Sequence, residues 1–167
     1  MEIALCLLYI VVLGHGSDTN IALYKTARQS TTAVGGFASR AVDGDTNSDY
    51  MHSSCMHTND GYGQWWEVDL FGFYEIERVV VFNRVDCCSD RLKNFTIKVF
   101  VNDPLKFVNE KPLLCGKHPG VVGISVTINC PTGVRGRFLR ITNYKMGNPL
   151  CMCEVQVYGD AAPKSSM

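Results

Sequence analysis

Short runs of alternating apolar and polar residues, separated by turn residues, restrict the fold of this chain more than any other feature. Residues 95–101 alternate in this way, whereas residues 79–82 form the β-branched run that is typical of a buried strand. The strand candidates are residues 65–70, 77–83, 95–101, 124–128, 138–141 and 155–158. The turn candidates are Gly72 and residues 102–104, 118–120 and 131–133. Many short strands without helical periodicity predict an all-β fold, namely an antiparallel β-sandwich.

The length and charge of the chain limit the number of domains and the kinds of partner. A chain of 167 residues is long enough for one domain with a substantial core. Its 16 basic and 16 acidic residues give a formal net charge of zero, which disfavours nucleic acid and anionic membranes as partners. The first third, up to about Gly63, holds few strand candidates, so we expect ordered loops there, held by ligands or disulfides.

The N-terminus has the pattern of a secretory signal peptide. Residues 3–13 form an apolar run that is too short to span a bilayer, and residues 14–16 are small enough for a signal peptidase site. The alternative is a buried N-terminal strand or helix. We predict a signal peptide over residues 1–16, one domain over 17–160 and a short fraying tail over 161–167. No second hydrophobic stretch follows, so the mature protein is expected to be secreted, without membrane insertion.

The cysteine content also indicates an oxidising compartment. Removal of the signal peptide would take Cys6 and leave seven cysteines, a high density for a chain of this length. The odd number leaves one thiol unpaired or engaged in an intermolecular bridge. Asn94 begins an Asn-Phe-Thr sequon, which predicts a glycosylation site if the chain is secreted.

The segment from Arg84 to Arg91 has the most informative composition in the chain. It places two arginines and Asp86 around two adjacent cysteines, and 26 residues separate Arg84 from His57. Taken singly, an Arg–Asp pair is more often a surface ion pair of small energetic value. Together, guanidinium forks, an imidazole and a sulfur surface can hold a small neutral ligand with hydroxyls on one side and an apolar face on the other. A deoxy sugar is such a ligand.

These residues resemble the F-type lectins, a fucose-binding family related to discoidin and coagulation-factor C-type domains. The family's sugar motif is a histidine, 26 residues, Arg-x-Asp, four residues, and then Arg or Lys. His57, Arg84, Asp86 and Arg91 meet this motif in full. The other matching segments are residues 20–30, 41–44, 65–70, 137–141 and 153–159. The resemblance covers residues 20–159 and implies a jelly-roll β-sandwich of the galactose-binding-domain type, with long ordered loops.

The resemblance implies a role for each residue of the motif. Arg84 and Arg91 would donate hydrogen bonds to sugar hydroxyls, and His57 would contact the axial hydroxyl or the ring oxygen. Asp86 would orient an arginine rather than touch the sugar, because it offsets two nearby positive charges. Tyr50, in the loop before His57, is our candidate for contacting the methyl group of fucose.

The resemblance also implies how the cysteines pair. In the family, the two adjacent cysteines form a disulfide that packs against the sugar ring, although each could instead bridge to a distant cysteine. The implied disulfides are Cys55–Cys153, Cys87–Cys88 and Cys115–Cys130. Cys151 is then left over, and it could be free, compete with Cys153 or link two chains.

A second group of residues is typical of a calcium site. Residues 43–49 carry side-chain oxygens at alternating positions, but their spacing does not fit an EF-hand. The resemblance implies a structural calcium ion that joins the early loops to the last strand. The implied ligands are the Arg40 carbonyl, Asp43, the Asp45 carbonyl, Ser54, the Cys153 carbonyl and Glu154. The alternative is a solvated acidic turn, and a zinc site at His52, Cys55 and His57 is disfavoured because a fourth ligand is missing.

The predicted function is binding of terminal L-fucose on glycans. One sugar engages only a few hydrogen bonds, each worth about 1 kcal/mol net, so useful avidity requires several linked sites. We therefore expect a homo-oligomer, and members of the family form trimers. The family also suggests a role in innate recognition.

Three other classes of function remain open at this point. One is an extracellular structural or matrix protein with a degenerate lectin fold, against which the complete motif argues. A discoidin-like adhesion or matrix module would bind protein or phospholipid through apolar loop tips and would not need the four-residue motif. A glycosidase needs two carboxyl groups about 5–10 Å apart. Asp86 and Asp90 flank arginines, and no second acid is well placed, so we expect the protein not to be an enzyme.

Overall fold

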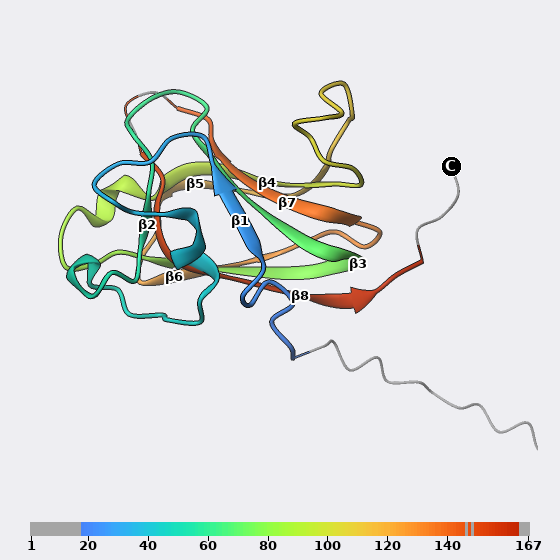
Figure 1. Cartoon of the computed structure of the whole chain (residues 1–167), viewed down its shortest axis with the longest axis horizontal. Helices are drawn as coiled ribbons and strands as arrows, with labels where there is room; N and C mark the ends of the chain where they lie inside the picture. The colour runs from blue at the N-terminus through green and yellow to red at the C-terminus, as the bar shows by residue number, and fades with distance from the viewer. Residues whose placement is uncertain (1–17, 146, 148, 164–167) are drawn as a thin grey trace, which may run out of the picture.

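Antiparallel strands form most of this protein, which we describe from a computed structural model (Figure 1). The structure describes residues 18–145, 147 and 149–163, so the predicted signal peptide lies outside the described residues. The strands are β1 (Thr26–Gln29), β2 (Met56–His57), β3 (Trp65–Asn83), β4 (Lys93–Phe100), β5 (Leu113–Val121), β6 (Ser125–Asn129), β7 (Arg135–Asn143) and β8 (Cys151–Ala161). Three short 3-10 helices accompany them: η1 (Ala38–Val42), η2 (Tyr50–His52) and η3 (Ser89–Arg91).

The long strand β3 connects the two layers of the fold. Its first part pairs with β1 and β7, whereas its last part pairs with β6 and β8. The register shifts between Asp69 and Tyr74, where Phe71 has a φ of +58°, so the strand kinks and the sheet folds over on itself. The main path of the sheet is β2-β8-β3-β7-β4-β5. The predicted antiparallel β-sandwich is therefore confirmed.

The alternating side chains of these strands form one hydrophobic core between the layers. Buried and less buried residues largely alternate along β4 and β7, because successive side chains of a strand point to opposite faces, whereas the first five residues of β8 are all buried. The largest apolar side chains of this core are Trp66, Phe95, Met56, Leu70, Ile76, Leu92, Ile97, Leu139, Ile141, Leu150 and Met152.

Two of the predicted turns are wrong. Gly72 lies inside β3, because the kink at Phe71 absorbs the change of direction without ending the strand. Residues 118–120 lie inside β5, which is the last strand on the main path of the sheet. Proline is tolerated there because an edge strand leaves its outward backbone groups unpaired. The predicted turns at 102–104 and 131–133 do lie outside strands, and β8 extends to Ala161, the first residue of the expected tail.

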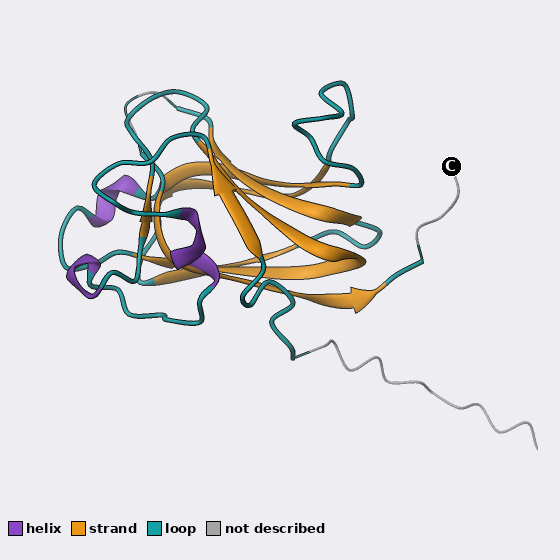
Figure 2. Cartoon of the chain, in the orientation of Figure 1, coloured by secondary structure: helices purple, strands orange, loops and turns teal. Residues whose placement is uncertain are grey.

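The three 3-10 helices and most long loops of the first third lie at one end of the strands (Figure 2). These loops are ordered, as expected, and the Cys55–Cys153 disulfide joins them to β8. The loop of residues 101–112 projects toward the other end of the molecule (Figure 1). Within the described residues, no helix is both long and apolar enough to cross a membrane.

Candidate functional site

His57 is held at the loop end of the sandwich in a defined protonation state. Strand β2 pairs with β8, which buries the imidazole to 6% exposure. Its Nε2 lies 3.0 Å from Arg91 Nη1, and its Nδ1 lies 2.6 Å from the Thr58 carbonyl oxygen. A guanidinium can only donate, so Nε2 accepts and the proton sits on Nδ1, which donates to Thr58. Burial lowers the pKa of His57, and the nearby charges of Arg91 and Arg84 lower it further, so the ring is neutral at pH 7.

Arg84 follows the last residue of β3, and a bidentate ion pair with Asp86 fixes its side chain. Its Nε and Nη2 donate to the two carboxylate oxygens at 2.8 and 2.7 Å. The backbone N–H of Tyr50 also donates to Asp86, at 3.1 Å. Mainly because of the Arg84 hydrogen bonds, the pKa of Asp86 is far below its usual range. Asp86 therefore orients a guanidinium, as expected from the sequence.

Tyr50 lies between the groups of the predicted motif. Its ring packs under the Arg84 guanidinium at 4.4 Å and stands at 89° to the His57 ring, with 6.1 Å between the ring centres. Its hydroxyl donates to the Val34 carbonyl at 2.8 Å. The structure thus gives Tyr50 a supporting position beneath Arg84, and its contact with a methyl group stays a prediction.

The segment between Arg84 and Arg91 forms a closed loop whose ends are tied by one buried side chain. Asn83 donates from Nδ2 to the carbonyls of Ser89 and Val122, at 2.9 and 3.0 Å. Cys88 adopts a left-handed conformation with φ of +56°, and its carbonyl accepts from the backbone of Arg91 at 3.0 Å. The loop therefore presents the Cys87–Cys88 disulfide and Arg91 together.

The cysteines pair as the family resemblance implies. The structure contains the disulfides Cys55–Cys153, Cys87–Cys88 and Cys115–Cys130. Cys151 is a buried free thiol that lies opposite His57 in the β2–β8 pairing, beside Tyr50. Burial raises the pKa of this thiol to about 11, so it is protonated and unreactive at neutral pH.

Two residues that shape the site are absent from the predicted set. Gly36 is one of them, because a Cβ built there would lie 2.6 Å from the His57 backbone nitrogen. Gln29 is the other, since its Nε2 donates to the carbonyls of both Gly36 and His57, at 3.0 and 3.1 Å. The Gly35-Gly36 pair is a sequence signal for such close approach, whereas nothing local marks Gln29.

One of the predicted calcium ligands, Glu154, is a buried carboxylate that lies near two others, Asp43 and Asp45. Glu154 is fully buried on β8; its Oε2 accepts from the Gly44 backbone at 3.3 Å, and its Oε1 has no hydrogen-bond partner within the described part of the chain. Burial, together with the charges of Asp43 and Asp45, raises the pKa of Glu154 to about 7. A buried carboxylate that faces other acids and has an unsatisfied oxygen is stabilised by a bound cation, so these residues fit the calcium ion.

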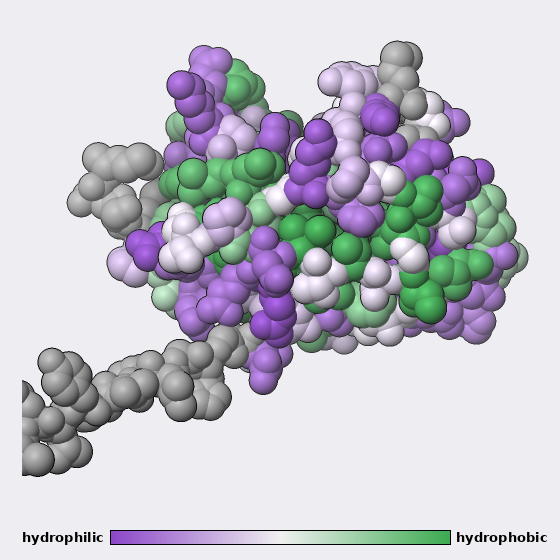
Figure 3. Space-filling model, turned by 180° about the vertical axis from the view of Figure 1, so that it is seen from behind, coloured by the Kyte–Doolittle hydropathy of each residue, from purple (hydrophilic) through white to green (hydrophobic). Residues whose placement is uncertain are grey.

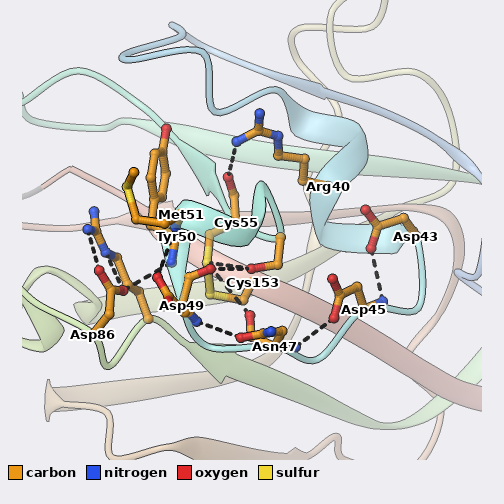
Figure 4. Close-up of a disulfide and its surroundings, with 12 residues drawn as sticks. Arg40, Asp43, Asp45, Asn47, Asp49, Tyr50, Met51, Cys55, Asp86 and Cys153 are labelled. Atoms are coloured by element: carbon orange, nitrogen blue, oxygen red, sulfur yellow. Dashed lines mark hydrogen bonds and ion pairs between the residues drawn. A yellow bond between two sulfur atoms is a disulfide. The ribbon is translucent and has the colours of Figure 1, made fainter.

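The loop that carries the remaining ligand candidates is ordered by its own side chains (Figure 4). Asp43, Asp45, Asn47 and Asp49 each accept from the backbone N–H two residues later, at 2.9–3.0 Å. The Ser54 hydroxyl donates to the Asp49 carbonyl at 2.9 Å. Among the residues that the structure describes, no three His, Cys, Asp or Glu side chains cluster as a metal site. The implied calcium site would not form such a cluster, because backbone carbonyls make up half of its ligands.

Arg40, Cys153 and Asn94 are the predicted positions that remain. Arg40 is at η1, where its guanidinium donates to the Cys55 carbonyl at 3.3 Å, and Cys153 is bonded to Cys55. Because Cys55 is disulfide-bonded, it has no thiolate with which to bind zinc, so the alternative zinc site loses one of its three ligands. Asn94 lies at the start of β4, half-buried, and its Oδ1 accepts from Gly120 at 3.1 Å. Its glycosylation stays a prediction.

The fold and the cluster of His57, Arg84 and Arg91 define a carbohydrate-binding β-sandwich of the galactose-binding type. Residues 40–141 match the family model of the NedA-like, galactose-binding domain. The chain is 35% identical over 143 residues to Fucolectin-3 of Anguilla japonica, which covers 83% of this chain and 78% of that protein. It belongs to the fucolectin, or F-type lectin, family. The members of this family are lectins, so the protein is not an enzyme, as expected.

Solved structures agree with this assignment. A Streptococcus pneumoniae fucose binding module has a TM-score of 0.75 and 35% identity, covering 85% of this chain and 98% of that one. The lectin domain of lectinolysin complexed with Lewis B antigen has a TM-score of 0.76 and 32% identity, covering 86% and 99%. The recognition of the family from the four-residue motif is therefore confirmed.

Proposed function

We propose that this protein is a lectin that binds terminal L-fucose on glycans through His57, Arg84 and Arg91. The observation that carries the proposal is the contact between His57 Nε2 and Arg91 Nη1, which brings together residues 34 positions apart. In this structure Arg91 donates to Nε2, and a sugar hydroxyl that replaced this contact would accept from Arg91 and donate to Nε2. The relatives described above, which include fucolectins and a fucose binding module, support the same ligand.

The protonation state of His57 narrows the expected contact to one type of sugar oxygen. Because its Nε2 carries no proton, His57 cannot donate to a ring oxygen, and it would accept from a hydroxyl that replaces Arg91 as the donor to the single Nε2 lone pair. Of the two contacts expected from the sequence, we therefore favour the axial hydroxyl. Arg84 and Arg91 retain donors for that oxygen and a neighbouring one, while the Cys87–Cys88 disulfide offers an apolar surface next to them.

The test is retention on immobilised L-fucose combined with a titration of free fucose. Arg84→Ala removes a charged hydrogen-bond donor, so we expect a loss of about 2 kcal/mol, roughly thirtyfold in affinity. Arg135→Ala is the matched control, because Arg135 also pairs with a carboxylate, Glu75, but lies outside the motif. Fucose binding that survives both Arg84→Ala and His57→Ala would refute the proposed site.

We further propose that the protein is secreted and that a structural calcium ion supports its site. The apolar N-terminal run, the three disulfides and the sequon support secretion. The carboxylates of Asp43 and Glu154 would supply the charge for calcium, with Ser54 and the carbonyls of Arg40, Asp45 and Cys153 completing the ligands. A bound ion would neutralise the buried Glu154 and hold the loop that leads to Tyr50.

We also propose that the lectin is a homo-oligomer active in innate recognition. A single site with a few hydrogen bonds binds weakly, whereas linked sites gain avidity without new contacts. We expect a molar mass in solution that is a multiple of the chain mass, measured by light scattering during size-exclusion chromatography. A monomer at all concentrations would contradict this proposal, and a glycan array would show whether microbial or self glycans are preferred.

A further inference from the structure

The loop of residues 101–112 is held in one shape although its tip is exposed. Glu110 accepts from the backbone of Val101 and Asn102 across the base of the loop, at 2.6 and 3.1 Å. Asp103 is bound by the Arg28 side chain and accepts from the Leu105 backbone at 3.0 Å. Although these hydrogen bonds hold the loop, Phe107 remains 55% exposed. A loop that is already ordered loses little conformational entropy when it binds a ligand.

A hollow of about 280 Å³ lies between this loop and strands β3 and β7. Its polar and aromatic lining consists mainly of Asp69, Asn102, Asp103, Lys106, Phe107 and Arg137. The hollow shares no residue with the proposed fucose site, and its loop lies toward the opposite end of the molecule (Figure 1). In the view from behind, the loop that projects from the molecule at the upper left carries hydrophilic residues next to hydrophobic ones (Figure 3).

Several polar groups of the lining have hydrogen-bonding capacity to spare. Arg137 donates from Nε and Nη2 to Asp69, both at 2.7 Å, which fixes its fork and leaves Nη1 without a protein partner in the described residues. Within the same residues, neither the Asn102 side-chain amide nor the Lys106 ammonium makes a hydrogen bond. The oriented guanidinium of Arg137, the amide of Asn102 that is unpaired within the described residues, and the exposed ring of Phe107 are the kinds of group that bind a small polar ligand.

The charges of the lining select the kind of ligand. Among the ionic groups of the lining, Asp69 is paired with Arg137 and Asp103 with Arg28, which lies next to the lining. Within the part of the chain that the structure describes, Lys106 is the one unpaired charge among them, so the lining offers neither a cluster of cations for an anion nor a free carboxylate for a cation. A neutral polyol suits both the donors and the acceptors of the lining, because each of its hydroxyls can donate and accept a hydrogen bond. Phe107 can cover the apolar C–H face of a sugar ring.

We propose that this hollow is a second carbohydrate-binding site, which takes a neutral sugar ring against Phe107 and the Arg137–Asp69 pair. Two sites on one chain would allow one lectin to hold two glycan branches or two neighbouring glycans. The fucose site need not function for this second site to bind.

The test follows backbone amide shifts of ¹⁵N-labelled protein during separate titrations with D-galactose, D-mannose, N-acetyl-D-glucosamine, L-fucose and D-glucuronate. Each titration is done with the native chain and with Arg84→Ala. We expect at least one neutral sugar to shift the amides of Lys106, Phe107 and Arg137 in both proteins. Fucose shifts at His57 and Arg91 report the proposed fucose site separately, so the failure of either site is distinguishable.

Matched variants separate the hollow from the rest of the loop. Phe107→Ala is expected to weaken the binding of that sugar at least tenfold, whereas Val108→Ala leaves it unchanged. Val108 is the better exposed of the two side chains, at 76%, and lies outside this hollow. The proposal is overturned if no neutral sugar shifts these amides, if glucuronate binds more tightly than the neutral sugars, or if Phe107→Ala binds like the native chain.

Discussion

At the scale of single residues, the protonation state of His57 decides what the site can bind. The neutral ring has one acceptor, Nε2, which receives a hydrogen bond from Arg91 in this structure and which a sugar hydroxyl would take over. A proton on Nε2 would remove this acceptor and place a third positive charge near Arg84 and Arg91. Asp86 does not compensate, because it is already engaged by Arg84. The site should therefore respond to mild acid.

We expect fucose affinity to fall when acid protonates His57, and thermal stability to fall as the pH drops below the unfolded value of about 6.5. The pKa of His57 is lowered in the folded protein, so above the unfolded value of about 6.5 neither state is protonated and the residue contributes nothing. Below it, the unfolded chain binds the proton first, and acid favours unfolding. The pKa of Asp86 lies far below this range, so its charge does not change.

The measurement is fucose affinity and melting temperature between about pH 5 and 8, in the presence of calcium. His52→Gln is the control, because the His52 side chain is 63% exposed and lies outside the motif, and it should leave the pH profile unchanged. Equal melting temperatures at the two ends of the range would contradict the lowered pKa of His57 in the folded protein.

At the scale of elements, the site depends on how closely the loop of residues 33–36 packs against β2. The backbone of His57 donates to the Gly36 carbonyl at 2.9 Å and accepts from Ala33 at 2.9 Å. These bonds act like an extra strand on β2, which has only two residues. The absence of a side chain at Gly36 allows the approach.

Gly36→Ala should therefore displace His57. The added Cβ would lie 2.6 Å from the His57 nitrogen and 2.7 Å from its Cβ, so we expect a destabilisation of about 1–3 kcal/mol and a clear loss of fucose affinity. Gly123→Ala is the matched control, since nothing lies within 4 Å of its added Cβ. Chemical denaturation and fucose titration measure both effects, and native-like binding by Gly36→Ala would show that the loop can move aside.

At the scale of the whole molecule, the early loops and β8 are joined twice at the same place. The Cys55–Cys153 disulfide forms one link, and the proposed calcium ion between Asp43 and Glu154 would form the other. Without a cation, Glu154 is a buried carboxylate with an unsatisfied oxygen. Folding should therefore be coupled to calcium.

We expect EDTA to lower the melting temperature and calcium to restore it. A ligand present at a hundredfold excess over its Kd stabilises the native state by about 2.7 kcal/mol, which corresponds to roughly 5–10 °C for a chain of this size. Differential scanning calorimetry measures the shift. Glu154→Gln should abolish the response, whereas Asp90→Asn, an exposed acid elsewhere, should keep it. A melting temperature indifferent to EDTA in the native chain would remove the calcium proposal.

Much of this protein was predictable because its patterns are local. Alternation along 95–101 and 138–141 reports which face of a strand is buried, and the structure places β4 and β7 there. The four-residue motif identified the family because its residue types and spacings occur together. The same family pattern implied the disulfides that the structure contains.

By itself, then, the sequence determined the fold class, the family and the residues of the fucose motif. Only the tertiary structure decided that residues 65–83 form one kinked strand, that Gly36 must lack a side chain, that His57 carries its proton on Nδ1, and that the loop of 101–112 encloses a hollow with β3 and β7. The physical reason is that burial, protonation and cavity shape depend on atoms brought together from distant parts of the chain. Alternation and motif spacing carry no information about those contacts.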